Sequence, residues 1–196
     1  MSEDFRFEVI AAGFTSDSTI PLAAISHDDG VVRASALRAL ARIGTLTDEI
    51  LTPYVSDSHI ETRRTAVELA ATHPSVKVHQ CLDDPDVFVA EMAAWCLGER
   101  IPASDIEIET LIDRTTTHEE AVVREACAAA LGSLGDERGL PAILAACSDK
   151  PAVRRRAILA LAPFEGDEVE AALQRALEDK DWQVRQNAED LLNPRG

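Results

Sequence analysis

The sequence predicts an all-α fold, a stack of about six helical hairpins forming an α-α superhelix across residues 1–196. One pattern recurs six times, with anchor residues spaced by about 30 positions. Each copy is too short to bury a core alone, so neighbouring copies must stack. Apolar residues in each copy follow the period of a helix and not the alternation of a strand. The anchors are Arg33, Arg63, Ala90, Arg124, Arg154 and Arg185.

The first helix of each hairpin surrounds its anchor. In the copy at Arg124, the apolar or small residues are Val123, Cys127, Ala130 and Leu131. At about 100° per residue these offsets share one helical face. The residue three positions after each anchor is small, which predicts closely packed helices. These six residues are Ala36, Ala66, Ala93, Cys127, Ala157 and Ala188.

A shorter apolar-periodic segment follows most first helices and predicts a second helix in each hairpin. These segments are residues 50–55, 108–112, 140–144 and 169–173. Glycine or proline separates the two helices, as expected of a turn. The turn residues are Gly44, Pro74, Pro102, Gly135 and Gly166.

Acidic residues precede most anchors and suggest how the copies are joined. They are Asp29, Asp57, Glu120, Asp149 and Asp181. An aspartate here can cap the helix that follows and can accept hydrogen bonds from arginine. We expect the anchor arginines to reach the acidic loops of neighbouring copies and form a structural ladder. A row of ligand-binding arginines is the alternative interpretation.

The predicted domain organisation is a single repeat domain. Residues 1–27 form an irregular N-terminal hairpin that caps the stack, and residues 28–178 hold the repeats. Residues 179–196 form a C-terminal capping helix, whose polar side chains suit a surface that faces solvent. The alternative is an array that lacks its last helix.

The charge is strongly acidic, with 35 Asp and Glu against 19 Lys and Arg, a formal net charge of −16. This field opposes polyanions, so we expect neither nucleic acid nor a membrane as a partner. The negative charge favours a basic protein partner. The alternative is that the excess of acidic residues serves only to keep the protein soluble. The chain shows no basic leader segment and no apolar run of membrane-spanning length, which predicts a cytoplasmic protein. Four cysteines at apolar helical positions predict buried thiols.

The stretch Val122–Asp136, followed by Leu140–Leu144, resembles the short HEAT-like repeats of phycobilisome lyases. Weaker matches cover residues 28 to 196. The resemblance implies an α-solenoid of the armadillo type. It also implies a choice of roles, because such repeats occur in scaffolds, enzyme subunits and DNA-repair proteins.

Two surfaces are candidates for partner binding. The first is the acidic concave face expected along the second helices, with Glu49, Glu107, Glu109, Glu168 and Glu170 pointing outward. An ordinary solvated helical face is the alternative there. The second surface is an aromatic pair seven residues apart, Phe88 and Trp95, in the copy whose anchor is Ala90. Both aromatic side chains are predicted to point away from the core, as Leu159 is, unless this copy twists and buries them.

Catalytic and metal-binding signatures are lacking in the sequence. The five histidines are scattered without metal-ligand spacing, and no nucleotide-binding glycine motif or nucleophile elbow is present. We therefore expect no catalytic residue, cofactor or metal site. The favoured function is a non-enzymatic protein-protein interaction scaffold or adaptor that uses its acidic concave face. A phycobilin-lyase-like enzyme or subunit acting on a protein-bound chromophore is the alternative, and the oligomeric state stays open.

Overall fold

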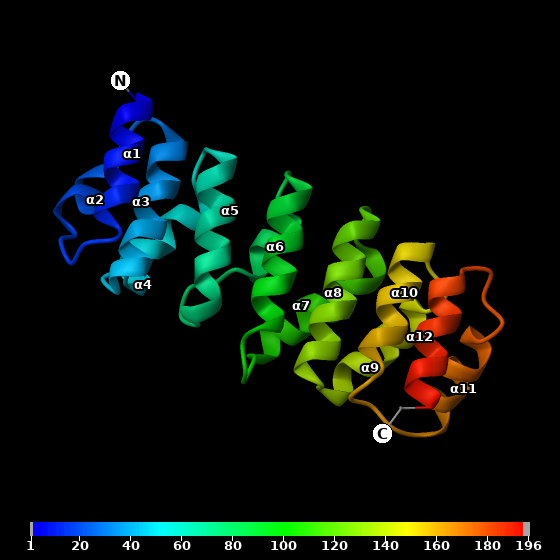
Figure 1. Ribbon diagram of the computed structural model, residues 1–196. Coiled ribbons are helices and arrows are strands. Elements are labelled where there is room, and N and C mark those ends of the chain that lie inside the picture. Colours follow the sequence, from blue (N-terminus) through cyan, green and yellow to red (C-terminus); the bar gives the residue numbers. More distant parts are fainter. Residues whose placement is uncertain (1, 194–196) are drawn as a thin grey trace. The chain divides into compact units, whose positions relative to one another are not determined.

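The computed structural model describes residues 2–193, and every ordered element in that range is a helix. The two ends of the predicted capping segments, residue 1 and residues 194–196, lie outside the described residues. The chain forms two compact units, Met1–Cys96 and Leu97–Gly196. Unit 1 and unit 2 are described separately below, with the element labels of Figure 1.

Unit 1 has long first helices and short second helices. The α-helices are α1 (Ser2–Ala12), α2 (Thr19–Ala24), α3 (Gly30–Ile43), α4 (Asp48–Leu51), α5 (Ile60–Leu69) and α6 (Val87–Gly98), which crosses into unit 2. Short 3-10 segments complete the connections at Thr52–Ser56, Ala70–Thr72 and His79–Asp83. Pro74 keeps its predecessor His73 out of the helical region, at φ −126° and ψ 72°, so no long helix forms there. Within residues 2–27 the chain forms two helices, α1 and α2.

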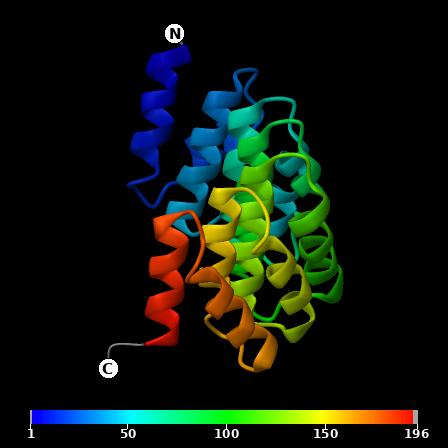
Figure 2. The ribbon, with the colours of Figure 1, turned by 90° about the vertical axis from the view of Figure 1, so that its right-hand side faces the viewer.

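Unit 2 has longer second helices. Its elements are α7 (Asp105–Thr117), α8 (Ala121–Leu134), a 3-10 turn (Glu137–Gly139), α9 (Leu140–Ala146), α10 (Pro151–Ala160), α11 (Asp167–Ala176) and α12 (Trp182–Leu192). The first helices form one layer, in which α10 packs between α8 and α12. The second helices lie beside them, and α7 contacts α9 (Figure 2). Unit 2 therefore presents a surface of three successive second helices.

Local sequence signals explain where the first helices begin and end. The side chains of Asp29 and Asp181 accept hydrogen bonds from the amides of Val31 and Gln183, which caps α3 and α12. Gly44 and Gly135 end α3 and α8 in the left-handed conformation that glycine adopts at low cost. Two of the three predicted turn glycines thus serve as helix C-caps, whereas Gly166 is the N-cap of α11.

Small residues let the first helices pack closely, as the repeat pattern predicts. The residue three positions after each anchor is fully buried in all six copies. Gly132 lies directly against the backbone of α10, because a Cβ atom added there would lie 2.6 Å from the Cα of Ala160. The separation of α8 and α10 is therefore set by the absence of side-chain atoms at their contact.

The anchor arginines form the predicted ladder. Each of four arginines donates from Nε and Nη2 to the two carboxylate oxygens of an aspartate in the loop before the next first helix, over 2.5–2.9 Å. The four rungs are Arg33–Asp57, Arg63–Asp84, Arg124–Asp149 and Arg154–Asp179. Asp57 and Asp149 were expected in this role, whereas Asp84 and Asp179 were not singled out. The arginines are thus engaged within the fold.

Candidate protein-binding surfaces

The acidic positions predicted on the second helices have different surroundings. Glu49 is exposed at the start of α4 in unit 1. Glu109 on α7 and Glu168 and Glu170 on α11 are exposed in unit 2. These four carboxylates are accessible to a partner.

Glu107 was expected to face outward, and that prediction is wrong. Its side chain is buried, with 7% of the residue exposed. One carboxylate oxygen accepts from Arg100 Nη1 at 2.6 Å, and the other accepts from the amide and hydroxyl of Ser104 at 2.8 and 2.7 Å. Burial alone would raise the pKa of Glu107, but these hydrogen bonds outweigh it and lower the pKa. Glu107 therefore holds the start of α7 in place.

The sequence did carry a signal for this role. Ser104 and Glu107 have the spacing of a capping box, in which serine and glutamate satisfy each other's backbone amides at a helix N-terminus. The prediction that Glu107 points outward rested on its charge and did not take this spacing into account.

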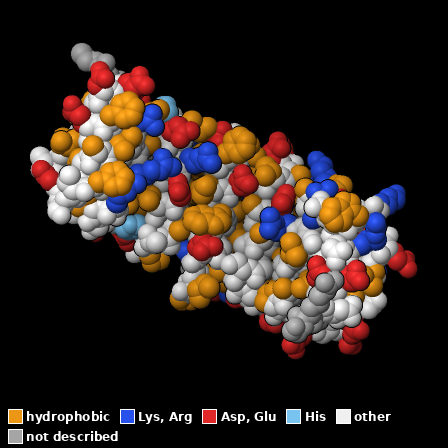
Figure 3. All heavy atoms as spheres, viewed as in Figure 1, with side chains coloured by type: hydrophobic (Ala, Val, Ile, Leu, Met, Phe, Trp, Pro, Cys, Tyr) orange, Lys and Arg blue, Asp and Glu red, His pale blue; other side chains and the backbone are white. Residues whose placement is uncertain are grey.

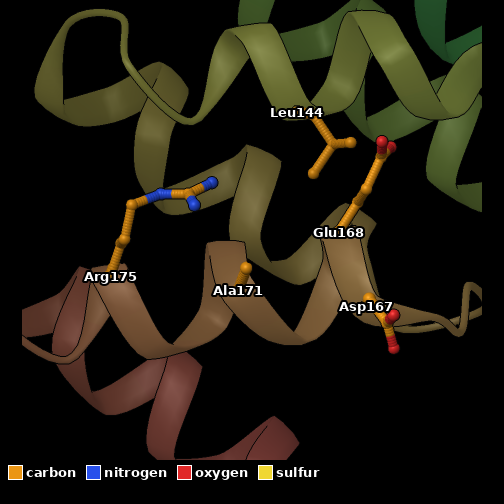
Figure 4. Close-up of a pocket in the computed structure, with 5 residues that line it drawn as sticks. All are labelled: Leu144, Asp167, Glu168, Ala171 and Arg175. Carbon is orange, nitrogen blue, oxygen red and sulfur yellow. The ribbon is translucent and has the colours of Figure 1, made fainter.

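A cleft of about 450 Å³ lies between α9 and α11 in unit 2. Leu144 points from α9 toward α11, where Glu168 and Arg175 rise on either side of Ala171 (Figure 4). Asp167 also lines the cleft at the start of α11. The cleft combines an apolar floor with one cation and two carboxylates.

The exposed side of α9 is small and uncharged. Pro141 and Ala145 are exposed there, and Ala145 also lines a second hollow of about 210 Å³ together with Thr115 and Thr116 of α7. The acidic side chains stand on the flanking helices α7 and α11. Unit 2 thus offers a shallow, uncharged strip between two acidic helices.

Ion pairs decide which of these charges remain available. Asp105 pairs with Arg138 at 2.8 Å, and Asp113 pairs with Arg114. No ion pair of Glu109, Glu168, Glu170 or Arg175 is found within residues 2–193. These four charges, together with that of the exposed Asp167, are therefore not neutralised by a neighbouring charge on the second helices of unit 2.

The aromatic pair of α6 lies on the surface of unit 1, as predicted. Phe88 is 57% exposed and Trp95 is 45% exposed, and Leu159 of α10 is similarly exposed at 44%. Ala90, the substituted anchor, is fully buried. The aromatic rings are accessible, and the alternative of a twist that buries them is excluded.

The cysteine thiols are the remaining groups that could react. All four cysteines are in the described range and none forms a disulfide; Cys96 and Cys127 are buried as predicted, whereas Cys81 and Cys147 are half-buried. Burial raises the pKa of the Cys147 thiol to about 11, so this thiol is a poor nucleophile at neutral pH.

Within residues 2–193, no three His, Cys, Asp or Glu side chains are grouped so as to hold a metal ion. None of the described helices is long and apolar enough to cross a membrane.

Comparisons with known proteins identify the repeats. Residues 75–152 match the model of HEAT repeats, and residues 153–179 match the model of the PBS lyase HEAT-like repeat. The two adjoining matches cover slightly more than half of the chain. The chain is a HEAT-repeat protein. Its repeats are of the phycobilisome-lyase type, as their sequence resemblance implied.

Solved structures support the same HEAT and armadillo architecture. The YibA protein of Escherichia coli is 16% identical with a TM-score of 0.65, and the match covers 94% of this HEAT-repeat chain and 72% of YibA. A chain in the structure of the CpcE–CpcF complex of phycocyanin lyase from Nostoc sp. PCC7120 is 20% identical with a TM-score of 0.62. The match covers 90% of the present chain and 76% of that chain. A designed armadillo repeat protein in complex with the peptide (KR)4 is 15% identical with a TM-score of 0.60, and the match covers 94% of this chain and 97% of the designed protein. No curated protein matches the sequence significantly. At these identities the likeness shows the fold alone.

Proposed function

We propose that this HEAT-repeat protein is a non-enzymatic scaffold or adaptor that binds a basic segment of a partner protein on the second helices of unit 2. The cleft between α9 and α11 carries the proposal. Leu144 and Ala171 offer apolar contact, and the unpaired carboxylate of Glu168 stands beside them. Such a cleft suits a chain segment that places an aliphatic stem on the floor and a cationic head against the carboxylate.

Electrostatics favour the same kind of partner. Glu109 on α7 and Glu170 on α11 are exposed, and the whole chain has a formal charge of −16. A field of this sign attracts a basic segment and speeds its association, and the effect weakens as salt is added. The designed armadillo repeat protein bound to (KR)4 supports the idea, because a stack of similar helices holds a basic peptide there.

A peptide titration tests the proposal directly. Labelled (Lys-Arg)4 is added to the wild-type chain and to variants, and binding is followed by fluorescence anisotropy at low and physiological salt. We expect E168Q combined with E170Q to weaken binding by about tenfold at low salt, since two attractive charges are lost. R175Q should tighten binding by about two- to threefold, because a repelling cation leaves the cleft.

Matched controls separate the cleft from the overall charge. E189Q removes one carboxylate from the exposed side of α12, in the layer of first helices, and should leave the affinity nearly unchanged. A peptide of equal length made of Gln and Ser should not bind. Equal affinity for all variants, or binding of the neutral peptide, would contradict the proposed site.

The aromatic pair of α6 remains a second proposed contact. Exposed aromatic side chains are frequent anchors of protein interfaces, and Phe88 and Trp95 lie on one stripe of the helix. Partners that the wild-type chain retains from a native lysate should be lost with W95A and kept with the equally exposed control L159A. Retention of the same partners by W95A would remove this surface from the proposal. Glu49 of unit 1 is kept as an additional acidic contact of the scaffold.

An enzyme of the phycobilin-lyase kind is the second candidate function. The match to the PBS lyase repeat and the fold shared with phycocyanin lyase favour it. The acidic cleft opposes it, because the propionate groups of a bilin carry negative charge. Incubating the chain with a bilin and its acceptor protein tests the candidate: covalent attachment above the rate without the chain would favour the lyase over the scaffold.

We also propose a cytoplasmic location. The four cysteines of the chain form no disulfide, which fits a reducing compartment.

A further inference from the structure

Helix α9 has a depression on each of its two sides. On one side lies the cleft of about 450 Å³ that it forms with α11. On the other side lies the hollow of about 210 Å³ that it forms with α7. The residues that line this hollow are Thr115, Thr116, Ala145, Ala146, Ser148 and Asp149. A chain segment that crosses α9 over the exposed Ala145 would reach both depressions.

The carboxylate in the hollow is already bound within the fold. Asp149 Oδ2 accepts from Arg124 Nε at 2.6 Å, and Oδ1 accepts from Arg124 Nη2 at 2.8 Å and from the amide of Lys150 at 2.6 Å. The remaining nitrogen of the guanidinium, Nη1, donates to the carbonyl oxygens of His118 and Glu119. Both oxygens of the carboxylate and all three nitrogens of the guanidinium are thus engaged.

The cleft and the hollow differ in their balance of charge. In the cleft, two carboxylates outnumber one cation. In the hollow, two cations counter the one carboxylate: the hydrogen bond from Arg124 lowers the pKa of Asp149, and the charge of Lys150 lowers it further. We therefore expect a cationic side chain to be attracted to the cleft and not to the hollow.

Hydroxyl and methyl groups form the rest of the accessible lining of the hollow. The hydroxyl of Thr116 donates to the carbonyl oxygen of Asp113 at 3.2 Å, which leaves its oxygen able to accept. Ser148 is exposed, and no hydrogen bond of its hydroxyl is found within residues 2–193. The methyl group of Ala145 lines the same hollow, whose volume is less than half that of the cleft. The hollow therefore suits a small side chain with a hydroxyl group.

The width of one helix sets the spacing between the two depressions. Packed helices lie about 8–10 Å apart, so a segment must advance about that far across α9. In the polyproline II conformation, residues three apart point the same way and are separated by about 9 Å. Side chains three residues apart in an extended segment therefore match the cleft and the hollow.

We propose that the bound segment carries a small hydroxyl residue three positions from the cation in the cleft, and that this residue fills the hollow between α7 and α9. The inference rests on the proposed function and specifies the sequence of its ligand, which is a spaced pair of residues and not an unbroken basic run. On the layer of first helices, by contrast, Lys and Arg side chains lie among Asp and Glu side chains over α8, α10 and α12 (Figure 3).

NMR titration of the full chain with proline-rich peptides tests the inference. The probe is Ser-Pro-Pro-Arg-Pro-Pro-Ser, which has a hydroxyl three residues from the arginine on either side, so the direction of binding does not matter. The control is Gly-Pro-Pro-Arg-Pro-Pro-Gly, and both peptides have blocked ends. We expect the serine peptide to bind about three- to tenfold more tightly, because a hydrogen bond is added. The methyl signals of Thr116 and Ala145 should shift with the serine peptide and not with the glycine peptide.

Variants of the hollow and of the cleft separate the two positions. A145L fills the hollow from an exposed position, and S148A removes a hydroxyl from its lining. Each should abolish the advantage of the serine peptide and leave the affinity for the glycine peptide unchanged. E168Q should weaken both peptides by the same factor. Thermal unfolding of the three variants checks that they remain folded.

The outcomes distinguish the inference from the proposed function. Equal affinity for the serine and glycine peptides, or an advantage that A145L and S148A both retain, would overturn the inference and leave the cleft in place. Tighter binding of Arg-Pro-Pro-Arg-Pro-Pro-Arg that shifts the Thr116 and Ala145 methyl signals would also overturn it, because the hollow would then hold a second cation. Binding of neither peptide at millimolar concentration, or binding that E168Q does not weaken, would contradict the proposed function itself.

Discussion

The arginine of each rung ties together two loops by two kinds of contact. Arg154 donates to the backbone carbonyl of Asp149 at 2.8 Å and to the carboxylate of Asp179 at 2.7 and 2.8 Å. Its side chain is 18% exposed and that of Asp179 is 15% exposed, so solvent screens the pair only in part. Removing one partner of such a pair leaves the other charge and a carbonyl without their bonds.

We therefore expect R154A to lower the free energy of unfolding by about 2–3 kcal/mol. R156A is the matched control, because Arg156 is 48% exposed and lies 3.7 Å from Glu125. The control should change stability by less than about 0.5 kcal/mol. Urea unfolding followed by circular dichroism measures both. Similar losses for the two variants would contradict a special role of the rung.

The rungs also predict how stability depends on pH. Hydrogen bonds from Arg124 and Arg154 lower the pKa of Asp149 and of Asp179. The folded chain thus binds fewer protons than the unfolded chain, whose Asp pKa is about 3.9. The stabilisation is fully present above that value and is lost as the pH falls through the lowered pKa of the folded state.

The melting temperature of the wild type should therefore fall steeply below about pH 4. D179N has already lost one titrating rung, so its melting temperature should be lower at pH 7 and should fall less between pH 5 and pH 3. Thermal scans at half-unit pH intervals measure the difference. Parallel curves for the two proteins would show that Asp179 contributes nothing to the acid transition.

At the scale of the elements, the contact of α8 with α10 depends on Gly132. An alanine there would bring its Cβ within 2.6 Å of the Cα of Ala160 and 2.9 Å of its carbonyl oxygen, so the helices would have to separate. Overpacking of this kind costs about 1–3 kcal/mol, whereas alanine gains up to about 1 kcal/mol in helix propensity over glycine. The two terms oppose each other, and backbone atoms do not move aside as a flexible side chain would.

G132A should therefore destabilise the chain despite alanine's higher helix propensity. S133A, at the next position of the same helix, is exposed and serves as the control. It should be neutral or slightly stabilising. The comparison by urea unfolding is direct, and a gain in stability for G132A would show that α8 and α10 adjust at little cost.

The first helices and their packing were predictable because the pattern repeats six times and the signals agree with one another. Buried Ala36 and Cys127, and the rung from Arg124 to Asp149, follow from spacing alone. Glu107 was misjudged because charge suggested exposure, whereas local geometry at Ser104 and the approach of Arg100 bury it. The cleft was also missed, since it depends on how Leu144 of α9 faces α11, and spacing within one helix does not report contacts between two.

At the scale of the whole molecule, the ladder found within residues 2–193 is interrupted at the third repeat. The anchor at the third repeat is Ala90, which is buried and has no guanidinium to donate. In the loop before α8, His118 lies six residues before the anchor Arg124. In the loops before α6 and α12 the same position holds an aspartate, Asp84 or Asp179, and each accepts the hydrogen bonds of a complete rung. Both members of that rung are absent. The rungs therefore fall into two sets, Arg33 with Arg63 and Arg124 with Arg154, which belong to the two compact units.

Repeat arrays are stabilised by each repeat and by its nearest neighbours, so a lost rung is felt locally. R63A should speed hydrogen exchange in α5 and in residues 79–86, which contain its partner Asp84, and should leave α10 and α12 at wild-type rates. R154A should have the reverse effect. Exchange followed by mass spectrometry resolves these segments. A uniform increase along the chain with either variant would contradict local stabilisation, because it would mean that the two sets of rungs unfold as one cooperative unit.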